Sequence, residues 1–505
     1  MSAKSIVLVN SFFYTFSALL VRAMSFFLLP IYTRFLTPED YGITNLVNSF
    51  NSVAIFIISF SLYIAVVRFY TDYKDDREQI KRFYGTIIIF IFISGLAFCI
   101  IVIIFRYILI RLIIKDISFY PVGFMALFIL LFLSLNTVHQ NILEGMQQGK
   151  KLTVINFIIF GSQVCLNMLF IGIYKLGAIG ILLATLITNL GYSLFMLYDL
   201  KKNNLITLCI DIRILKASLK YSIPIMPHNL STPIANFISR LLINNSSSLS
   251  SVGLYSIASQ FGSIIDTVQA SVNQAFAPWF YDMMNSCNQE ARKDVVSFSY
   301  SLILIYSLIY MVIGLFSQEA IIIMTNERYI IAWTAVPILV IAYSVKSIYY
   351  FYVSVLFFYK EASRKLFIAT ISGSFADIII AFVLVPKYGM YGAAFSFLVA
   401  KVIVVTIVII ISKRYDDIGF SVIKMIIIII PSLLFMIAGL YFSYTKYLTV
   451  FSWINLLYKL VVLSAYLVYI FITNKKNISI IINSEFIKQI IGELKSKNFK
   501  ELSLK

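Results

Sequence analysis

Long apolar stretches alternate with short polar segments along the chain, and each is long enough to cross a hydrocarbon core of roughly 30 Å as a helix. By this length criterion there are about fourteen. They cover residues 5–32, 42–67, 84–107, 118–143, 152–175, 177–199, 219–244, 251–276, 294–317, 333–358, 364–385, 390–412, 422–443 and 450–473. Backbone polar groups have no water partner in lipid, so a membrane-crossing apolar stretch must be helical. The pattern predicts an all-α polytopic membrane protein.

The first stretch carries an arginine in its interior and no acidic residue. Arg22 lies roughly 18 Å along the helix axis from Arg34, near mid-membrane. An arginine there costs several kcal/mol unless it faces water or a partner. Small and polar residues share its helical face: Ser11, Thr15, Ala18 and Ser25. We expect this face to line a wet cavity with an anionic occupant; for the serine and threonine residues, a seam against a neighbouring helix is the alternative.

A second arginine, Arg240, lies in the stretch 219–244, which its three prolines should bend or interrupt. Asn229 and Asn236 share its helical face, and Asn48 lies on a polar face of the second stretch. Arg240 either faces the same cavity or snorkels to the interface, since it is close to the end of its helix. The predicted substrate-binding residues are Arg22, Arg240, Asn48, Asn229, Asn236 and Lys346.

Further charged residues lie inside the predicted membrane helices. Asp266 is the clearest acid among them, and it either carries a coupling ion such as a proton or pairs with an arginine. Lys346 lies among tyrosines and is expected to contact the substrate or the interface between the two halves. Asp377 and Lys401 fall in consecutive stretches, and we predict that they form a structural ion pair.

An internal repeat divides the chain. The motif Lys-x-Gly-x-x-Gly occurs at residues 175–180 and again at 387–392, and nearly the same offset lays Tyr41-Gly42 on Val252-Gly253. Two equivalent lobes of six helices follow, with parallel topology and the substrate site between them. The predicted parts are an N-terminal lobe at 1–202, a cytoplasmic linker at 203–218, a C-terminal lobe at 219–415, two apolar accessory helices within 416–473 and a basic cytoplasmic tail at 474–505.

Composition agrees with this picture. The chain has 505 residues, of which 60% are hydrophobic and only 13% charged, whereas soluble chains carry about a quarter charged residues. Most of the 41 lysines and arginines fall in loops on one side, so the positive-inside rule places both termini in the cytoplasm. The net charge of +18 therefore reflects topology, and we predict no nucleic-acid partner. The four scattered cysteines indicate neither a disulfide framework nor a metal site, and no cofactor is expected.

The segment from Arg22 through Leu29 to Gly42 resembles that of the polysaccharide-flippase branch (Wzx-type O-antigen and capsule translocases) of the multidrug/oligosaccharidyl-lipid/polysaccharide exporter superfamily. The resemblance implies a V-shaped, MATE-like transporter in the bacterial inner membrane. It implies that undecaprenyl-diphosphate-linked oligosaccharide repeat units move from the inner to the outer leaflet by alternating access. Arg22, and less directly Arg240, would contact the diphosphate. Other polysaccharide-assembly proteins are implied partners alongside the lipid bilayer.

Three alternatives remain at this point. A lipid II flippase of the same fold is hardly separable by sequence. A cation-coupled multidrug exporter would need an acid inside the first lobe and a cavity that is not cationic. A membrane polysaccharide polymerase or acyltransferase would need a large outer loop or a catalytic histidine, and His139 and His228 have no acidic motif beside them. We therefore expect a transporter rather than an enzyme, with proton or sodium coupling and the identity of the sugar left open.

Overall fold

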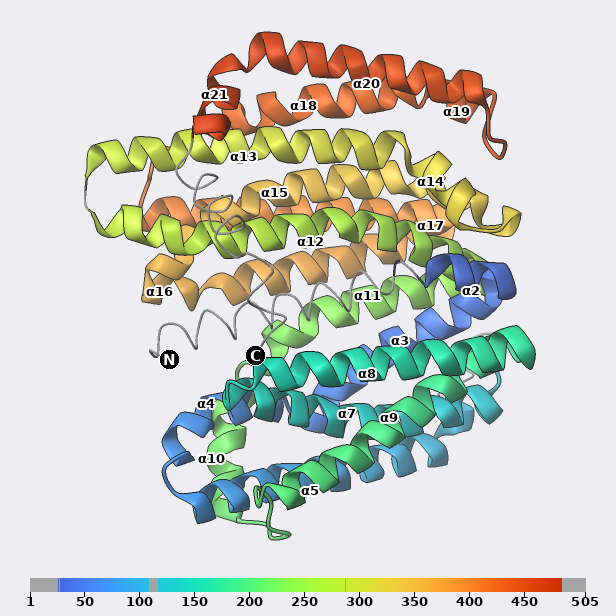
Figure 1. Ribbon diagram of the computed structural model, residues 1–505, viewed down its shortest axis with the longest axis vertical. Coiled ribbons are helices and arrows are strands. Elements are labelled where there is room, and N and C mark those ends of the chain that lie inside the picture. The colour runs from blue at the N-terminus through green and yellow to red at the C-terminus, as the bar shows by residue number, and fades with distance from the viewer. Residues whose placement is uncertain (1–25, 27, 109–116, 287, 484–505) are drawn as a thin grey trace, which may run out of the picture. The chain divides into compact units, whose positions relative to one another are not determined.

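The computed structural model describes residues 26, 28–108, 117–286 and 288–483 (Figure 1). These residues are nearly all helical and include no strand, which confirms the predicted fold class. Arg22 and most of the first predicted span lie outside the described residues, as does most of the basic tail. The predicted polar face around Arg22 therefore stays a prediction.

The described helices follow one another with short connections. In chain order they are α2 (Leu29–Phe35), α3 (Pro38–Ser59), α4 (Leu62–Tyr73), α5 (Arg77–Ile104), η1 (Phe119–Gly123), α7 (Phe124–Gly145), α8 (Gly149–Asn167), η2 (Met168–Ile173), α9 (Gly177–Lys202), α10 (Ile212–Ser222), α11 (Met226–Ser246), α12 (Leu249–Asn285), α13 (Gln289–Leu315), α14 (Ser317–Met324), η3 (Glu327–Ala335), α15 (Val336–Phe358), α16 (Lys360–Ser363), α17 (Leu366–Tyr415), α18 (Val422–Gly439), α19 (Tyr441–Thr445), α20 (Trp453–Thr473) and α21 (Lys475–Asn483).

Ten helical segments in the described part of the chain are long and apolar enough to cross a membrane. One of them, Glu361–Tyr415, contains two of the predicted spans, and the helix breaks between them at Gly389. Neither α11 nor α12 is among the ten described segments. These two helices carry the polar residues singled out above, which lower their mean hydropathy.

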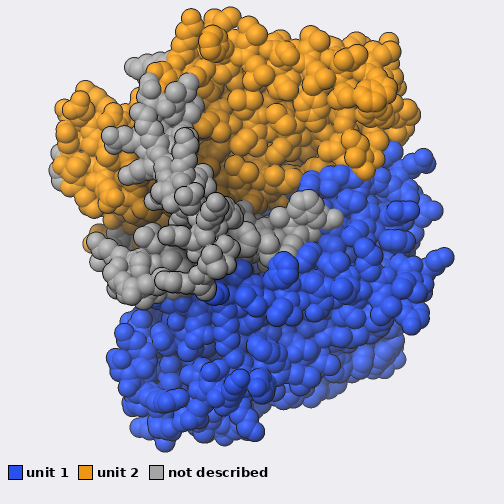
Figure 2. All heavy atoms as spheres, viewed as in Figure 1, with its two compact units in different colours: residues 1–260, 324–332, 370–396 blue, residues 261–323, 333–369, 397–505 orange. Residues whose placement is uncertain are grey.

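The chain packs into two compact units (Figure 2). Of the described residues, unit 1 takes those up to 260, 324–332 and 370–396, and unit 2 takes 261–323, 333–369 and 397 onward. These limits follow packing density, whereas the predicted lobes follow the sequence repeat. The lobe boundaries therefore stay a prediction.

The second predicted span, 42–67, is not one continuous helix. α3 ends at Ser59, Phe60 and Ser61 adopt left-handed backbone angles with φ of +47° and +58°, and α4 begins at Leu62. Left-handed angles are costly for residues with a Cβ. Buried side chains on both sides of the break, Ile58 and Leu62 among them, pack into one core with α5 and α7 and hold it in place.

Two glycines that the repeat predicts to correspond meet in unit 1. A Cβ on Gly42 of α3 would lie 2.0 Å from the Leu249 carbonyl oxygen, and a Cβ on Gly253 of α12 would lie 2.1 Å from the Pro38 carbonyl oxygen. The contact is reciprocal, so the two helices cross backbone to backbone. Only glycine allows helices to approach this closely.

The two glycine turns also match. Gly177, at the start of α9, and Gly389, inside α17, have φ of +57° and +53°. At the first turn the Asp40 carboxylate accepts a hydrogen bond from the Ala178 backbone N–H at 2.9 Å, and a Cβ on Gly177 would lie 2.7 Å from that carboxylate. The repeated motif is therefore required both by backbone angle and by close packing.

In unit 2, α13 packs against α15, α18 and α21, and α18 packs against α20. The interior of the unit is rich in large aromatic side chains. Those that are fully buried include Trp333, Tyr306, Tyr310, Tyr352, Phe276, Phe280 and Phe351. The two C-terminal spans, predicted as an accessory pair, are thus bound to the unit through α13.

Candidate functional site

Arg240 lies in unit 1 on α11, one turn after Asn236. Its Nη1 donates to the Asn236 carbonyl oxygen at 3.2 Å, and its guanidinium carbon lies 5.8 Å from the ring centroid of Tyr255 on α12. The side chain is half-buried. The span containing it is interrupted as predicted, since α10 ends at Ser222 and α11 begins at Met226, with a turn between them. The guanidinium thus lies against a carbonyl dipole and a tyrosine face, and its positive charge is of the kind that binds anionic groups.

Aromatic and amide groups surround this arginine. Tyr41 on α3 lies within electrostatic range of Arg240, and its hydroxyl donates to Gln260 Oε1 at 3.0 Å. The Tyr41 ring lies 6.5 Å from that of Tyr32 and 6.3 Å from that of Tyr329, the second pair edge to face. The helices thus build an aromatic wall with an arginine beside it, a combination that binds sugar rings and phosphate.

Sequence reasoning found only part of this wall. Tyr41 stood out through its repeat position, but Tyr255 and Tyr329 did not, because tyrosine is common throughout this chain. Of the predicted amides, Asn229 and Asn236 are half-buried on α11, and Asn48 is exposed on α3. All three stay candidates for substrate contact.

Unit 2 holds the second group of predicted residues. Lys346 Nζ on α15 lies 2.5 Å from Asp266 Oδ1 on α12, and the Tyr350 hydroxyl donates to the same oxygen at 3.0 Å. The two charged side chains are 23% and 28% exposed, so the pair is neither fully buried nor free in solvent. The predicted arginine partner of Asp266 is thus replaced by a lysine.

A second cation lies near this pair. Lys401 on α17 is within electrostatic range of Asp266, and its Nζ lies 4.4 Å from the Phe397 ring centroid. Asp377 lies in unit 1, where it is buried and within electrostatic range of Tyr255. The ion pair predicted between Asp377 and Lys401 stays a prediction.

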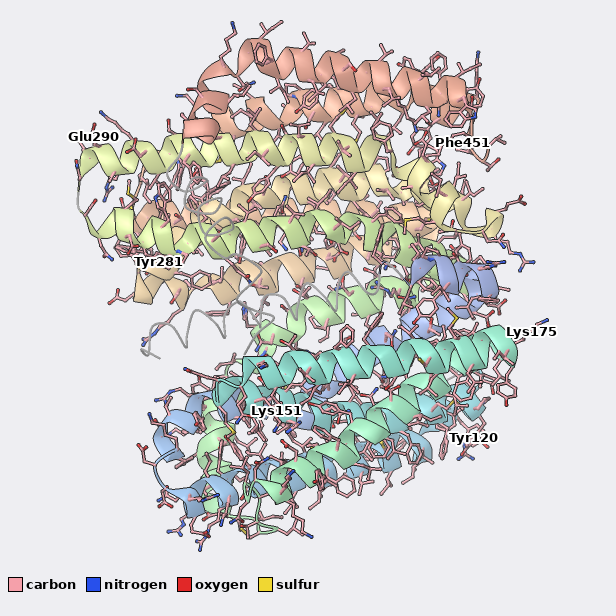
Figure 3. All side chains as sticks on the ribbon, in the orientation of Figure 1. Tyr120, Lys151, Lys175, Tyr281, Glu290 and Phe451 are labelled. Carbon is pink, nitrogen blue, oxygen red and sulfur yellow. The ribbon has the colours of Figure 1, made fainter. Side chains whose placement is uncertain are left out.

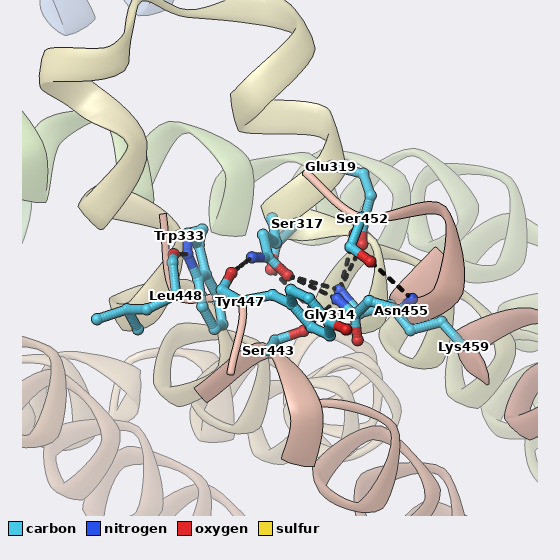
Figure 4. Close-up of polar contacts among 11 residues, drawn as sticks. Gly314, Ser317, Glu319, Trp333, Ser443, Tyr447, Leu448, Ser452, Asn455 and Lys459 are labelled. Carbon is cyan, nitrogen blue, oxygen red and sulfur yellow. Dashed lines mark hydrogen bonds and ion pairs between the residues drawn. The ribbon is translucent and has the colours of Figure 1, made fainter. Parts of the chain in front are cut away.

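A fully buried ion pair that sequence reasoning missed joins α14 to α20 (Figure 4). Lys459 Nζ donates to both carboxylate oxygens of Glu319, at 2.7 and 2.8 Å, and to Gln318 Oε1 at 3.1 Å. Asn455 Nδ2 donates to the same Gln318 oxygen at 3.2 Å and to Ser443 Oγ at 3.0 Å. The spacing of Asn455 and Lys459, one helical turn apart, was the available signal.

Unit 1 contains another polar network that the sequence did not predict. His139 is fully buried on α7, with Nδ1 2.9 Å from the Tyr192 hydroxyl and Nε2 3.2 Å from Asp199 Oδ2. Lys151 lies near the start of α8 (Figure 3). Its Nζ donates to both Asp199 carboxylate oxygens at 2.6 Å. No acidic motif lies beside His139 in the sequence, and the acid that it contacts, Asp199, comes from a different helix. His139 is fully buried and the Lys151 side chain is 33% exposed, so the group is enclosed except at Lys151 and suits an anchor among three helices.

Residues 7–284 match the family model described as "Polysaccharide biosynthesis protein". The chain belongs to this family. A search of curated proteins found no match.

Several solved structures are similar to this chain in fold. One described as an inward-facing multidrug resistance MATE family transporter of the MOP superfamily has a TM-score of 0.64 at 16% identity, covering 78% of this chain and 94% of its own. A MOP superfamily transporter from Pyrococcus furiosus has a TM-score of 0.57 at 16% sequence identity, and the match covers 83% of this chain and 97% of that one. Lipid II flippase MurJ in an inward closed conformation has a TM-score of 0.57 at 16% sequence identity, and the match covers 91% of this chain and 98% of that one. At such identity the likeness shows the fold alone, which is MATE-like.

Proposed function

We propose that this chain is a flippase that moves undecaprenyl-diphosphate-linked oligosaccharide repeat units from the inner to the outer leaflet of the bacterial inner membrane. The observation that carries the proposal is Arg240, a half-buried arginine held by a carbonyl oxygen and a tyrosine ring beside an aromatic wall. A diphosphate offers the bidentate oxygens that a guanidinium binds well, and tyrosine faces and amides suit sugars. Membership of the polysaccharide biosynthesis family supports this substrate class over drugs.

The Asp266–Lys346 pair supplies a means of coupling. Lys346 is the group that a diphosphate attracts, and once it turns to the substrate, Asp266 loses its principal cation. A carboxylate that loses its contacting cation in a low-dielectric site takes up a proton more readily. The groups facing Asp266 are Lys346 and Tyr350 by direct contact, and Tyr349 and Lys401 electrostatically. Substrate binding and proton uptake at Asp266 are thereby linked in this proposal.

The test uses cells that lack the chain, in which lipid-linked oligosaccharides are extracted, identified by mass and assigned to a leaflet. Accumulation of undecaprenyl-diphosphate repeat units on the cytoplasmic face is the expected result. Accumulation of lipid II instead would favour the function named for the MurJ structure. Intact surface glycan with no accumulation would refute the proposal and favour a drug exporter.

Variants of one arginine then test the diphosphate contact. Arg240→Ala should fail to restore export at normal membrane abundance, and Arg240→Lys should restore part of it. A hydrogen bond to a charged group is worth about 1.5–3 kcal/mol, equivalent to a loss in affinity of roughly 10- to 150-fold. The matched control is Arg213→Ala on α10, whose side chain is 95% exposed. Full export by Arg240→Ala would exclude this contact.

A further inference from the structure

Two cavities lie along α13 in unit 2. One, of about 820 Å³, is lined by polar and charged residues from the first turns of α13, the loop before α18, and α18 itself. The other, of about 560 Å³, is lined by apolar residues of α13 and α20. Glu290 marks the end of α13 at which the polar cavity lies (Figure 3). The positive-inside prediction places this end in the cytoplasm.

The two cavities follow one another along α13, and together they are named the groove, with a polar and an apolar section. A stripe of α13 residues at i, i+4 spacing lines the two sections in turn: Arg292, Val296 and Tyr300 line the polar section, and Leu304 and Leu308 line the apolar section. The stripe winds around the helix by about 40° per step. On α21 the adjacent residues Asn477 and Ile478 line the polar and the apolar section respectively. The stripe is roughly 24 Å long at 1.5 Å per residue. This is close to the ~20–22 Å of one bilayer leaflet with its headgroups.

The polar section has a fixed side and an open side. Arg292 forms two hydrogen bonds with Asp416, at 2.8 and 3.0 Å, and Asp416 also accepts a hydrogen bond from the Tyr359 hydroxyl at 2.8 Å. The Arg292–Asp416 pair is neutral overall, and the carboxylate of Asp416 is held by both Arg292 and Tyr359. Lys293 of α13 and Lys424 of α18 are exposed lining residues, and the acid that lines the same section is Asp417. The exposed lining charges therefore sum to an excess of positive charge.

We propose that this groove binds a phosphatidylglycerol-type phospholipid of the inner leaflet. Its phosphate lies between Lys293 and Lys424, its glycerol hydroxyls donate to Asp417, and an acyl chain follows Leu304 and Leu308 toward α20. The charge excess favours an anionic phosphodiester over a zwitterionic one, and the polar-to-apolar order along α13 matches the order of headgroup and chain in a lipid. The site is separate from the transport proposal, because it uses none of the residues assigned to the substrate.

The experiment measures lipid binding to the purified full-length chain in detergent, by native mass spectrometry and by thermal shift. Phosphatidylglycerol should bind more tightly than phosphatidylethanolamine or phosphatidylcholine with the same acyl chains. The double variant K293Q/K424Q should lose this preference, with phosphatidylglycerol affinity falling roughly tenfold or more, since each lysine near an anionic surface contributes about a fivefold factor. The matched control K201Q/K202Q removes two exposed lysines from the end of α9 in unit 1 and should leave binding unchanged.

A second variant tests the apolar section without changing charge. Leu308→Trp fills the groove at a half-buried position, so it should weaken phosphatidylglycerol with long acyl chains and leave a short-chain form unaffected. Equal binding of all three headgroups, an equal loss in K201Q/K202Q, or tighter binding of undecaprenyl diphosphate than of phosphatidylglycerol at this groove would each overturn the proposal.

Discussion

Removing one member of the buried Lys459–Glu319 pair should strongly destabilise the protein, whereas replacing both members with apolar residues should leave its stability nearly unchanged. Lys459 is 0% exposed and Glu319 7% exposed, so neither charge finds water when its partner is removed. Removing one member of such a pair typically costs about 3–5 kcal/mol, whereas replacing both with apolar residues of similar volume is often neutral. Lys459→Met retains most of the side-chain volume, and Glu319→Leu removes the acid.

The magnitude follows from the size of the chain. Unfolding entropy is about 2.1 cal/mol/K per residue, which for the whole chain is roughly 1.1 kcal/mol/K, so a loss of 3–5 kcal/mol lowers Tm by about 3–5 °C. We expect this decrease for Lys459→Met alone and for Glu319→Leu alone, and recovery of most of it in the double variant. The measurement is thermal unfolding of the purified protein in detergent.

An exposed ion pair serves as the control. Arg68 and Asp72 on α4 lie 2.9 Å apart with side chains 51% and 44% exposed, and the Asp72 carboxylate raises the pKa of the Arg68 guanidinium. Such an exposed i,i+4 pair contributes little to stability, so Arg68→Gln should shift Tm by less than about 1 °C. If the double variant at Lys459 and Glu319 is as destabilised as the two single variants added together, the two groups do not interact and the reasoning fails.

Two further predictions concern the helix crossing and the coupling pair. Gly42→Ala should lower Tm, because its Cβ would lie 2.0 Å from the Leu249 carbonyl oxygen and such overpacking costs about 1–3 kcal/mol of folding stability. As a control, Gly161→Ala should be neutral or slightly stabilising, since its Cβ would have nothing within 4 Å. Equal changes in Tm for the two variants would contradict the backbone-to-backbone crossing. Asp266→Asn should slow export and flatten the pH dependence of export. The double variant Asp266→Asn/Lys346→Met should regain folding stability but not the coupling of export to protons. An unchanged pH profile of export in vesicles would exclude Asp266 as the proton carrier.

The sequence by itself determined the helical, membrane-spanning architecture. The length of an apolar run and its polar interruptions are local properties, and in lipid they leave the backbone no alternative to helix. The repeated glycines could also be read from the sequence. The positive φ at positions 177 and 389 and the close backbone approach at positions 42 and 253 both require glycine, so this residue recurs at corresponding positions. The helix break after Ser59 could not be read from the sequence, since Phe60 and Ser61 have no intrinsic preference for left-handed backbone angles.

Only the tertiary structure decided which charges pair. Asp266 was readable as an acid within a predicted membrane span, but its partner Lys346 lies 80 residues away on another helix. Lys459 and Glu319 are separated by 140 residues, and neither has a partner in its own neighbourhood of the sequence. A buried charge must find an opposite charge because an isolated one costs too much in low dielectric, yet that requirement states only that a partner exists. Which side chain meets it depends on the packing of helices distant in the chain.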